Sequence, residues 1–193
     1  MYSQNDEERY ILEAVKDSSR KHLLDIGAWD PKDKSNSRAL IEQGWRAVLI
    51  EPSPGPLKSL LAEYGYNPAV QIVAAAVAME QLLADFEMSD DAISSDQAKH
   101  VALWRQHTKY LGRMKVWTMT PNQIFDIFGA FDFISIDAEG SSVDILKAVL
   151  KSEMYPACIC VEHDDRIVEA CQAAAERGYK MTYASGENLV FAR

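Results

Sequence analysis

Three short apolar runs in this chain each carry a carboxylate at or just after their end. The runs cover residues 23–26, 47–50 and 131–136, and each is followed by a turn-forming glycine or proline. In open α/β sheets ligands bind at the carboxyl ends of the strands, so strands of this design predict one acid-lined cleft. The carboxylates concerned are Asp25, Glu51, Asp137 and Glu139.

Strands and helices are expected to alternate along most of the chain. Predicted strands cover 22–26, 47–51, 70–78, 131–137, 157–162, 179–184 and 189–192, and predicted helices cover 38–43, 54–64, 121–128, 142–150 and 165–177. Alternation of this kind predicts an α/β fold with a mainly parallel, twisted sheet and helices on both faces. The last two strands are joined by Ser185-Gly186-Glu187-Asn188, which is typical of an antiparallel hairpin.

A segment at about 79–114 interrupts this rhythm. Residues 82–88 suit a strand, 90–110 are polar and are expected to be helical in part, and 116–119 suit a second short strand. At 193 residues the chain fits one domain, so we interpret the segment as an insertion within a single domain of residues 1–193. Such insertions often carry specificity, and we expect this one to contact the substrate.

Charge and composition narrow the classes of partner. The net charge of −9 argues against a nucleic-acid partner, because phosphate binding needs a basic surface. No apolar run reaches the roughly 18 residues of a membrane span, and the N-terminus shows no signal peptide, so a cytoplasmic protein without membrane contact is expected. Cys158, Cys160 and Cys171 are spaced wrongly for zinc and are expected to be free thiols, with no metal bound.

The first two strands predict a ribose-binding pair of acids. Asp25-Ile26-Gly27 ends the first strand, and Glu51 follows Gly27 by 24 residues, which suits a carboxylate that binds ribose hydroxyls. The pattern G-x-G-x-x-G of dinucleotide sites is reduced to Gly27, and a nearby carboxylate disfavours a pyrophosphate. The ammonium and sulfonium of S-adenosylmethionine suit such acids and the aromatic face of Trp29. The alternative is that Asp25 and Glu51 only cap helices or turns.

Several motifs together resemble the FkbM-type family of S-adenosylmethionine-dependent methyltransferases. The matching pieces are residues 24–28 (LDIGA), 35–37 (SNS), 44–46 (GWR), 50–54 (IEPSP), 134–140 (ISIDAEG), 161–163 (VEH) and 188–191 (NLVF). This resemblance implies the Rossmann-like class I methyltransferase fold and methylation of a hydroxyl oxygen on a saccharide or other small molecule.

The resemblance also implies a set of cofactor contacts. Asp25 and Gly27 would flank the methionine moiety, Glu51 would hold the ribose, and Pro52 with residues 74–76 would lie near the adenine. The full set expected to bind the cofactor is Asp25, Gly27, Ala28, Asn36, Ser37, Glu51, Pro52, Ala75 and Asp137. The glycine-rich turn of the family is replaced here by Ala28-Trp29-Asp30-Pro31, and residues 35–37 either cap the next helix or reach the methionine carboxylate.

Two residues are candidates for the base that takes the hydroxyl proton. His163 follows the fifth main strand and has an ordinary pKa suited to this task, and Asp137 is its rival. Glu139 and Trp29 are expected on the substrate side, although Glu139 also suits a backbone-binding role in the turn. Two other classes of protein stay open: a non-catalytic module that binds S-adenosylmethionine or adenosine, and a nicotinamide-dependent oxidoreductase.

Overall fold

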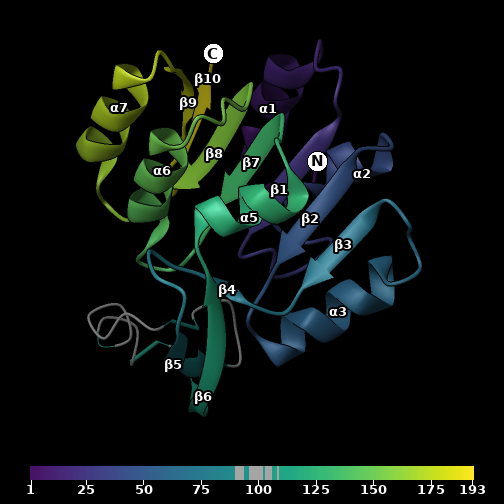
Figure 1. Ribbon diagram of the computed structural model, residues 1–193, viewed down its shortest axis with the longest axis vertical. Coiled ribbons are helices and arrows are strands. Elements are labelled where there is room, and N and C mark those ends of the chain that lie inside the picture. The colour runs from purple at the N-terminus through teal and green to yellow at the C-terminus, as the bar shows by residue number, and fades with distance from the viewer. Residues whose placement is uncertain (90–93, 96–101, 103–105, 108) are drawn as a thin grey trace.

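A central seven-stranded sheet organises the computed structural model, which describes residues 1–193 except 90–93, 96–101, 103–105 and 108. The strand order is β3-β2-β1-β7-β8-β10-β9 (Figure 1). All neighbouring pairs are parallel except those that β10 makes with β8 and β9. The strands are β1 (His22–Ile26), β2 (Arg46–Ile50), β3 (Val70–Val73), β7 (Phe133–Ile136), β8 (Cys158–Glu162), β9 (Lys180–Ala184) and β10 (Asn188–Ala192).

The prediction of a mainly parallel sheet with an antiparallel C-terminal hairpin is confirmed. Its central strands are buried on both faces, which explains why they are almost continuously apolar rather than alternating. The hairpin lies at one edge of the sheet, and only the order of its two strands was not predicted. Strand β10 inserts between β8 and β9, so that β9 forms the edge and β10 alone runs against the others.

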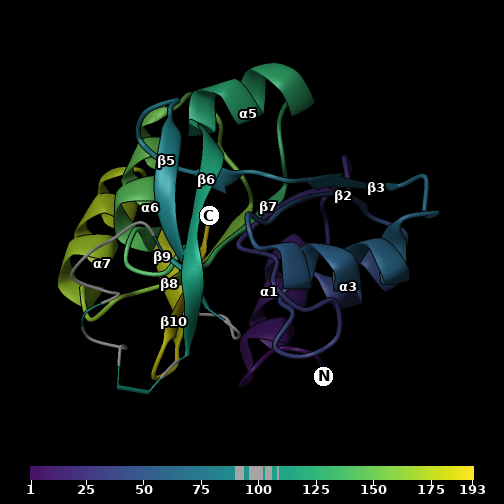
Figure 2. The same ribbon diagram turned by 90° about the horizontal axis from the view of Figure 1, so that it is seen from below.

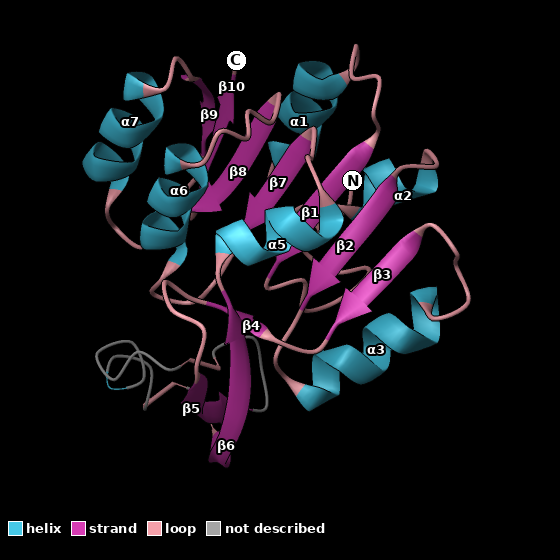
Figure 3. Cartoon of the chain, viewed as in Figure 1, coloured by secondary structure: helices cyan, strands magenta, loops and turns pink. Residues whose placement is uncertain are grey.

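Helices cover both faces of the sheet, as Figures 2 and 3 show. One face packs against α1 (Glu7–Val15), α2 (Arg38–Glu42) and α3 (Pro54–Tyr64), and the other against α5 (Pro121–Phe128), α6 (Ser142–Lys151) and α7 (Ile167–Glu176). Helix α5 begins as its sequence predicts: Thr120 and Gln123 form a reciprocal capping box, with Pro121 in the first turn. Alternate residues of one strand serve the two cores, so that Leu23 faces α1 and Leu24 faces α6.

A second, three-stranded sheet forms an arm at the carboxyl edge of the main sheet (Figure 1). It contains β4 (Ala76–Val77), β5 (Leu83–Ser89) and β6 (Tyr110–Met119), in the order β4-β6-β5. The prediction of one strand over 70–78 is wrong, because the main-sheet strand ends at Val73 and Ala76–Val77 pair with β6 instead. Strand β6 is also longer than the predicted strand over 116–119. Most of the segment expected to be helical, 90–110, lies outside the described residues.

Two further predictions concern thiols and membranes. Cys158 and Cys160 are buried free thiols and Cys171 is a half-buried one, as expected. Within the described part of the chain, no helix combines the length and the apolar character that crossing a bilayer requires.

Candidate active site

A cavity of about 640 Å³ opens at the carboxyl ends of β1, β2, β7 and β8. Cavities of this size hold ligands as large as a nucleoside cofactor. The cleft predicted from the strand-ending acids is therefore present. Nearly all the residues predicted for the site line it: Asp25, Gly27, Ala28, Trp29, Asn36, Glu51, Pro52, Ala75, Asp137, Glu139 and His163.

Ser37 is the exception among the predicted cofactor contacts. It is buried beside Asp25, to which its side chain gives a hydrogen bond, and it is not one of the residues lining the cavity. Ser35, not Ser37, caps the start of α2, because its hydroxyl accepts a hydrogen bond from the backbone N–H of Arg38 at 3.2 Å. We therefore expect Ser37 to orient Asp25 rather than to contact a ligand.

Asp25 is a buried acid on the floor of the cavity. Only 4% of its surface is exposed, and burial raises the pKa of Asp25 to about 6, although hydrogen bonds from Ser37 and Ser135 oppose the shift. Removing a carboxylate from water without a cation beside it disfavours the charged form. A ligand cation near Asp25 would restore the charge, so the site suits a positively charged group.

Glu51 follows β2 and is equally buried, at 4% exposure. Its Oε2 accepts a hydrogen bond from the backbone N–H of Trp29 at 3.1 Å, and its Oε1 accepts one from Ser53 at 2.6 Å. The structural role considered for Glu51, holding a turn, is therefore real. The side chain of Ser53 also hydrogen-bonds to Glu51, so a pair of ligand hydroxyls would take the remaining acceptor position of the carboxylate and displace the Ser53 hydroxyl.

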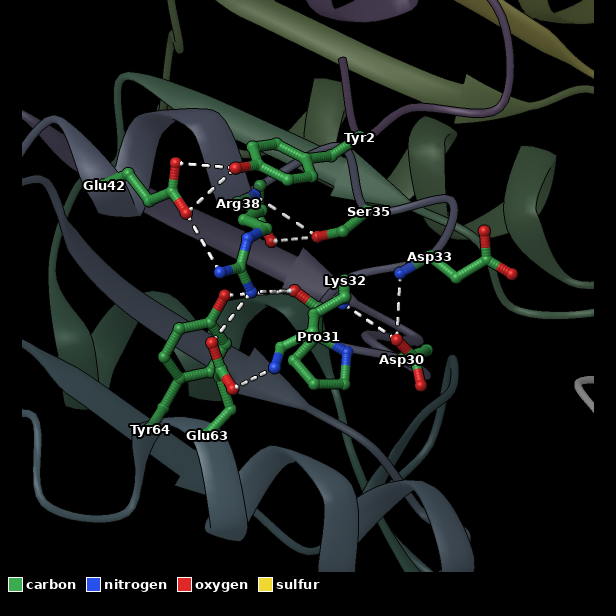
Figure 4. A network of polar contacts seen from close by, with 11 residues as sticks. Tyr2, Asp30, Pro31, Lys32, Asp33, Ser35, Arg38, Glu42, Glu63 and Tyr64 are labelled. Carbon is green, nitrogen blue, oxygen red and sulfur yellow. Dashed lines mark hydrogen bonds and ion pairs between the residues drawn. The ribbon is translucent and has the colours of Figure 1, made fainter.

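The loop between β1 and α2 is held by a network around Arg38 (Figure 4). The guanidinium donates to the carbonyl oxygen of Pro31 at 2.9 Å and pairs with Glu42 at 2.9 Å and Glu63 at 3.0 Å. Its Cζ lies 4.8 Å from the ring centroid of Tyr2, on the N-terminal segment. Because this loop supplies Ala28, Trp29 and Asn36 to the cavity, the network fixes the cavity wall at the place where residues 28–31 replace the family's glycine-rich turn.

Three carboxylates crowd the far end of the cavity. Ligand atoms of Asp137, Glu139 and Glu162 all lie within 4.8 Å of one another. Asp137 and Glu162 end the neighbouring strands β7 and β8 and share a hydrogen bond, and Glu162 also accepts one from the hydroxyl of Ser142 at 3.4 Å. Oxygens so close could surround a cation, but their spacing alone does not define a metal site, and the absence of a metal stays a prediction.

The pKa of both Asp137 and Glu162 is raised, first because the protein around each carboxylate excludes water and then because other acids lie beside it. The side chain of Asp137 is nevertheless open to the cavity, since the cavity reaches down to it. Two carboxylates joined by a hydrogen bond need a proton between them, so the pair shares one proton. Glu162 was missed as a site residue, although it ends an apolar strand as the other acids do.

His163 lies next to Glu162 and is 5% exposed. Its backbone N–H donates to the carbonyl oxygen of Glu187 at 2.8 Å, which ties the end of β8 to the β9–β10 turn. Its Nδ1 accepts a hydrogen bond from the backbone N–H of Asp165 at 3.1 Å. Its Nε2 is buried and has no hydrogen-bond partner among the described residues, and the side chain lines the cavity.

Strained backbone gathers at this cavity. Non-glycine residues with positive φ values occur in the loops after β1, β7 and β8, at Trp29, Lys34, Glu139, Asp164 and Asp165, and all of these line the cavity. Such conformations cost free energy and persist where the surrounding structure enforces them, which is common at functional sites. The pattern of apolar and polar residues in the sequence does not predict these positive φ values.

The arm closes one side of the cavity. Phe86 of β5 and the serines Ser94 and Ser95 line it, and the hydroxyl of Ser95 donates to the backbone carbonyl of Glu139 at 2.9 Å. This contact uses the backbone carbonyl of Glu139, while the Glu139 carboxylate lies beside those of Asp137 and Glu162. The arm and Glu139 thus share one wall of the cavity.

The solved structures to which this chain is similar include a methyltransferase. The chain is similar to a precorrin-6y C5,15-methyltransferase from Geobacter metallireducens, with 15% identity, a TM-score of 0.52, and coverage of 96% of this chain and 86% of that one. It also aligns with the putative methyltransferase yhhF from Escherichia coli, with 9% identity, a TM-score of 0.48, and coverage of 100% and 88%. A comparison with curated proteins finds no match.

The sheet order and the position of the cavity define a Rossmann-like class I methyltransferase fold, as expected. The model of the methyltransferase FkbM domain matches residues 25–181, which is most of the chain. This chain belongs to the FkbM methyltransferase family. Of the classes that the sequence left open, the methyltransferase is the one supported.

Proposed function

We propose that this enzyme binds S-adenosylmethionine in the cavity and methylates a hydroxyl oxygen of a small molecule or saccharide. The single observation that carries the proposal is the convergence of Asp25, Glu51 and Asp137 on one cavity at the ends of adjacent strands. S-adenosylmethionine would supply a methyl group on a sulfonium, which an oxygen nucleophile takes while the bonding electrons stay on sulfur.

The residues present fit this cofactor. The remaining acceptor capacity of Glu51 suits the two ribose hydroxyls, and Pro52 and Ala75 offer an apolar wall for an adenine. The Oδ1 of Asn36 is buried without a hydrogen-bond partner among the described residues, and an ammonium is a donor that would satisfy it. Asp25 would gain a compensating cation at the same end of the cavity.

The acceptor would occupy the end formed by Glu139, His163 and the arm. Carboxylates dominate this end, so they support a neutral or cationic acceptor and argue against nucleic acid. Aligning two reactants in one cavity is a large part of what such an enzyme contributes, because it replaces a bimolecular encounter. Trp29 also lines the cavity, and we expect its side chain to contact the acceptor.

Calorimetry on the full chain tests the cofactor assignment. S-adenosylmethionine and its demethylated product should bind, and NAD should not. The Glu51→Ala variant should bind S-adenosylmethionine about ten- to a hundredfold more weakly, because it removes charge-assisted hydrogen bonds. Glu176→Ala, at the end of α7 and away from the cavity, is the matched control. Equal affinity of a folded Glu51→Ala variant would remove Glu51 from the site.

A second assay addresses the reaction. Labelled methyl groups from S-adenosylmethionine should appear as methyl ethers on members of a panel of sugars and hydroxylated small molecules. Transfer to nitrogen or carbon instead of oxygen would contradict the proposed hydroxyl acceptor while leaving the cofactor assignment standing.

A further inference from the structure

Two histidines in the described part of the chain, His22 and His163, are buried, and their hydrogen bonds specify opposite tautomers. The Nδ1 of His22 lies 3.1 Å from the carbonyl oxygen of Ala130. A carbonyl only accepts, so His22 carries its proton on Nδ1. The Nδ1 of His163 lies 3.1 Å from the backbone N–H of Asp165, which only donates. Neutral His163 therefore has a bare Nδ1 and carries its proton on Nε2.

This assignment changes what His163 can do. The protonated Nε2 is buried, lacks a partner among the described residues, and belongs to a side chain that lines the cavity. A buried N–H without a partner is costly, so the site is complete only when an oxygen accepts from it. The lone pair of the neutral ring is on Nδ1, where it already accepts the hydrogen bond from the backbone N–H of Asp165. His163 is thus arranged to donate a hydrogen bond, not to take a proton.

The neighbouring acids offer a different proton acceptor. Asp137 ends β7 beside Glu162 at the end of β8, and a hydrogen bond joins them. Ser142 donates to Glu162, and the backbone N–H of Ala138 donates to Ser142 at 2.9 Å, so the pair is anchored to the start of α6. The charged groups that face Asp137 are Asp25 on β1, Glu139 in its own loop, and Glu162 and Asp164 at the end of β8.

We infer that His163 holds an oxygen of the methyl acceptor by donating from Nε2, and that Asp137 takes the hydroxyl proton while Glu162 donates to Asp137. The inference rests on the proposed hydroxyl methylation. The O–H bond of the acceptor would break and its proton would pass to the Asp137 carboxylate. The electron pair on oxygen would form the new bond to the methyl carbon as the carbon–sulfur bond breaks and its electrons stay on sulfur. The acceptor must therefore present an oxygen to Nε2, which a polyhydroxylated molecule does readily.

Nitrogen NMR of histidine-labelled protein tests the tautomer without any reaction. We expect His163 to be protonated on Nε2 and His22 on Nδ1, so the two buried rings give opposite patterns in one spectrum. Assignment follows from the His163→Gln and His22→Gln variants. Protonation of His163 on Nδ1, with a bare Nε2, would overturn the inference because a lone pair would then face the cavity.

Kinetics of matched variants test the roles. Glutamine places an N–H near the position of Nε2 but cannot act as a base, whereas alanine removes the donor. We expect His163→Ala to raise the KM of the acceptor about tenfold, and His163→Gln to recover most of that loss. If both variants lose about 10²–10⁴-fold in kcat and flatten the pH–rate profile, His163 is the base and the inference fails.

The acids provide the complementary comparison. Asp137→Asn should lower kcat by about 10²–10⁴-fold at saturating cofactor, because the proton acceptor is gone. Glu162→Gln should lose far less, since its amide can still donate to Asp137; a loss as large as that of Asp137→Asn would overturn the assignment. Methyl transfer by the wild-type enzyme is measured in parallel, so failure of the proposed function, which would abolish transfer to every hydroxyl acceptor, is separate from failure of this inference.

Discussion

The Cα of Gly27 lies directly against the carbonyl oxygen of Asp137, where the ends of β1 and β7 meet. A Cβ atom added to Gly27 would lie 1.7 Å from that oxygen, and Gly27 has a φ of +76°. The backbone N–H of Gly27 also donates to Ile50 at 2.9 Å, so the residue ties three strands together at the floor of the cavity. The closeness of β1 and β7 at this point brings Asp25 and Asp137 to one site.

Gly27→Ala should therefore damage both stability and binding. The clash is with backbone, which cannot rotate away, and the positive φ adds strain of about 1–3 kcal/mol. Denaturant unfolding should show a clear loss of stability, and S-adenosylmethionine affinity should fall with it. Gly55→Ala in α3, where a Cβ meets nothing within 4 Å, is the control and should be neutral or slightly stabilising. Equal behaviour of the two variants would contradict the close approach.

Asp25 predicts a dependence of stability on pH. Burial raises the pKa of Asp25 to about 6, above its ordinary value of 3.8, so the native state holds this proton more tightly than the unfolded state. The contribution of Asp25 to the free energy of unfolding should fall by about 2–3 kcal/mol as pH rises from about 4 to 6, and then stay constant.

Comparison of Asp25→Asn with wild type isolates this effect from that of other acids. The variant should lose less stability than wild type between pH 4 and pH 7, whereas Asp126→Asn, on the exposed face of α5, should follow wild type. The affinity of wild type for S-adenosylmethionine should in turn weaken below pH 6, because protonation removes the charge that faces the cofactor. Parallel curves for Asp25→Asn and wild type would show that Asp25 titrates normally.

The Arg38 network should control the cofactor end of the cavity. Replacing Arg38 by Met removes its ion pairs with two carboxylates and its hydrogen bond to the carbonyl of Pro31, which keeps only the hydroxyl of Tyr64 as a donor at 3.2 Å, so the loop after β1 should loosen. We expect the Kd of S-adenosylmethionine to rise about tenfold, about 1.4 kcal/mol, with the acceptor KM little changed at saturating cofactor. Lys32→Met removes only an exposed ion pair with Glu63 and should have little effect. Unaltered cofactor binding by Arg38→Met would mean that other contacts hold the loop.

The acid-lined acceptor end should discriminate by charge. Of two saccharides that differ only at one position, the neutral alcohol should be methylated at least about tenfold more efficiently than the uronic acid, because like charges placed together cost several kcal/mol. The comparison of kcat/KM at pH 7.5 measures this directly. A preference for the uronic acid would contradict the account and would point to Arg166, which lines the cavity but is paired with Asp144 and Glu169, as its partner.

Most of this fold could be predicted from the sequence, because the central strands are buried on both faces and the helices have clear boundaries. The strand-ending acids led to the cavity for the same reason, since parallel strands bring their carboxyl ends to one edge. Strand β4 was missed because residues 74–76 are alanines, whose small side chains do not distinguish continuation of β3 from a switch to the arm. Nor does sequence specify the tautomer of His163, which depends on a hydrogen bond within its own turn.

A crystal structure of the enzyme with S-adenosylhomocysteine tests the central claim most directly. We predict that the two ribose hydroxyl oxygens lie within about 3.2 Å of the Glu51 carboxylate, with the amino group on the side of Asp25 and the adenine against Pro52 and Ala75. A ligand bound elsewhere, or one whose ribose lies away from Glu51, would contradict this account of the site.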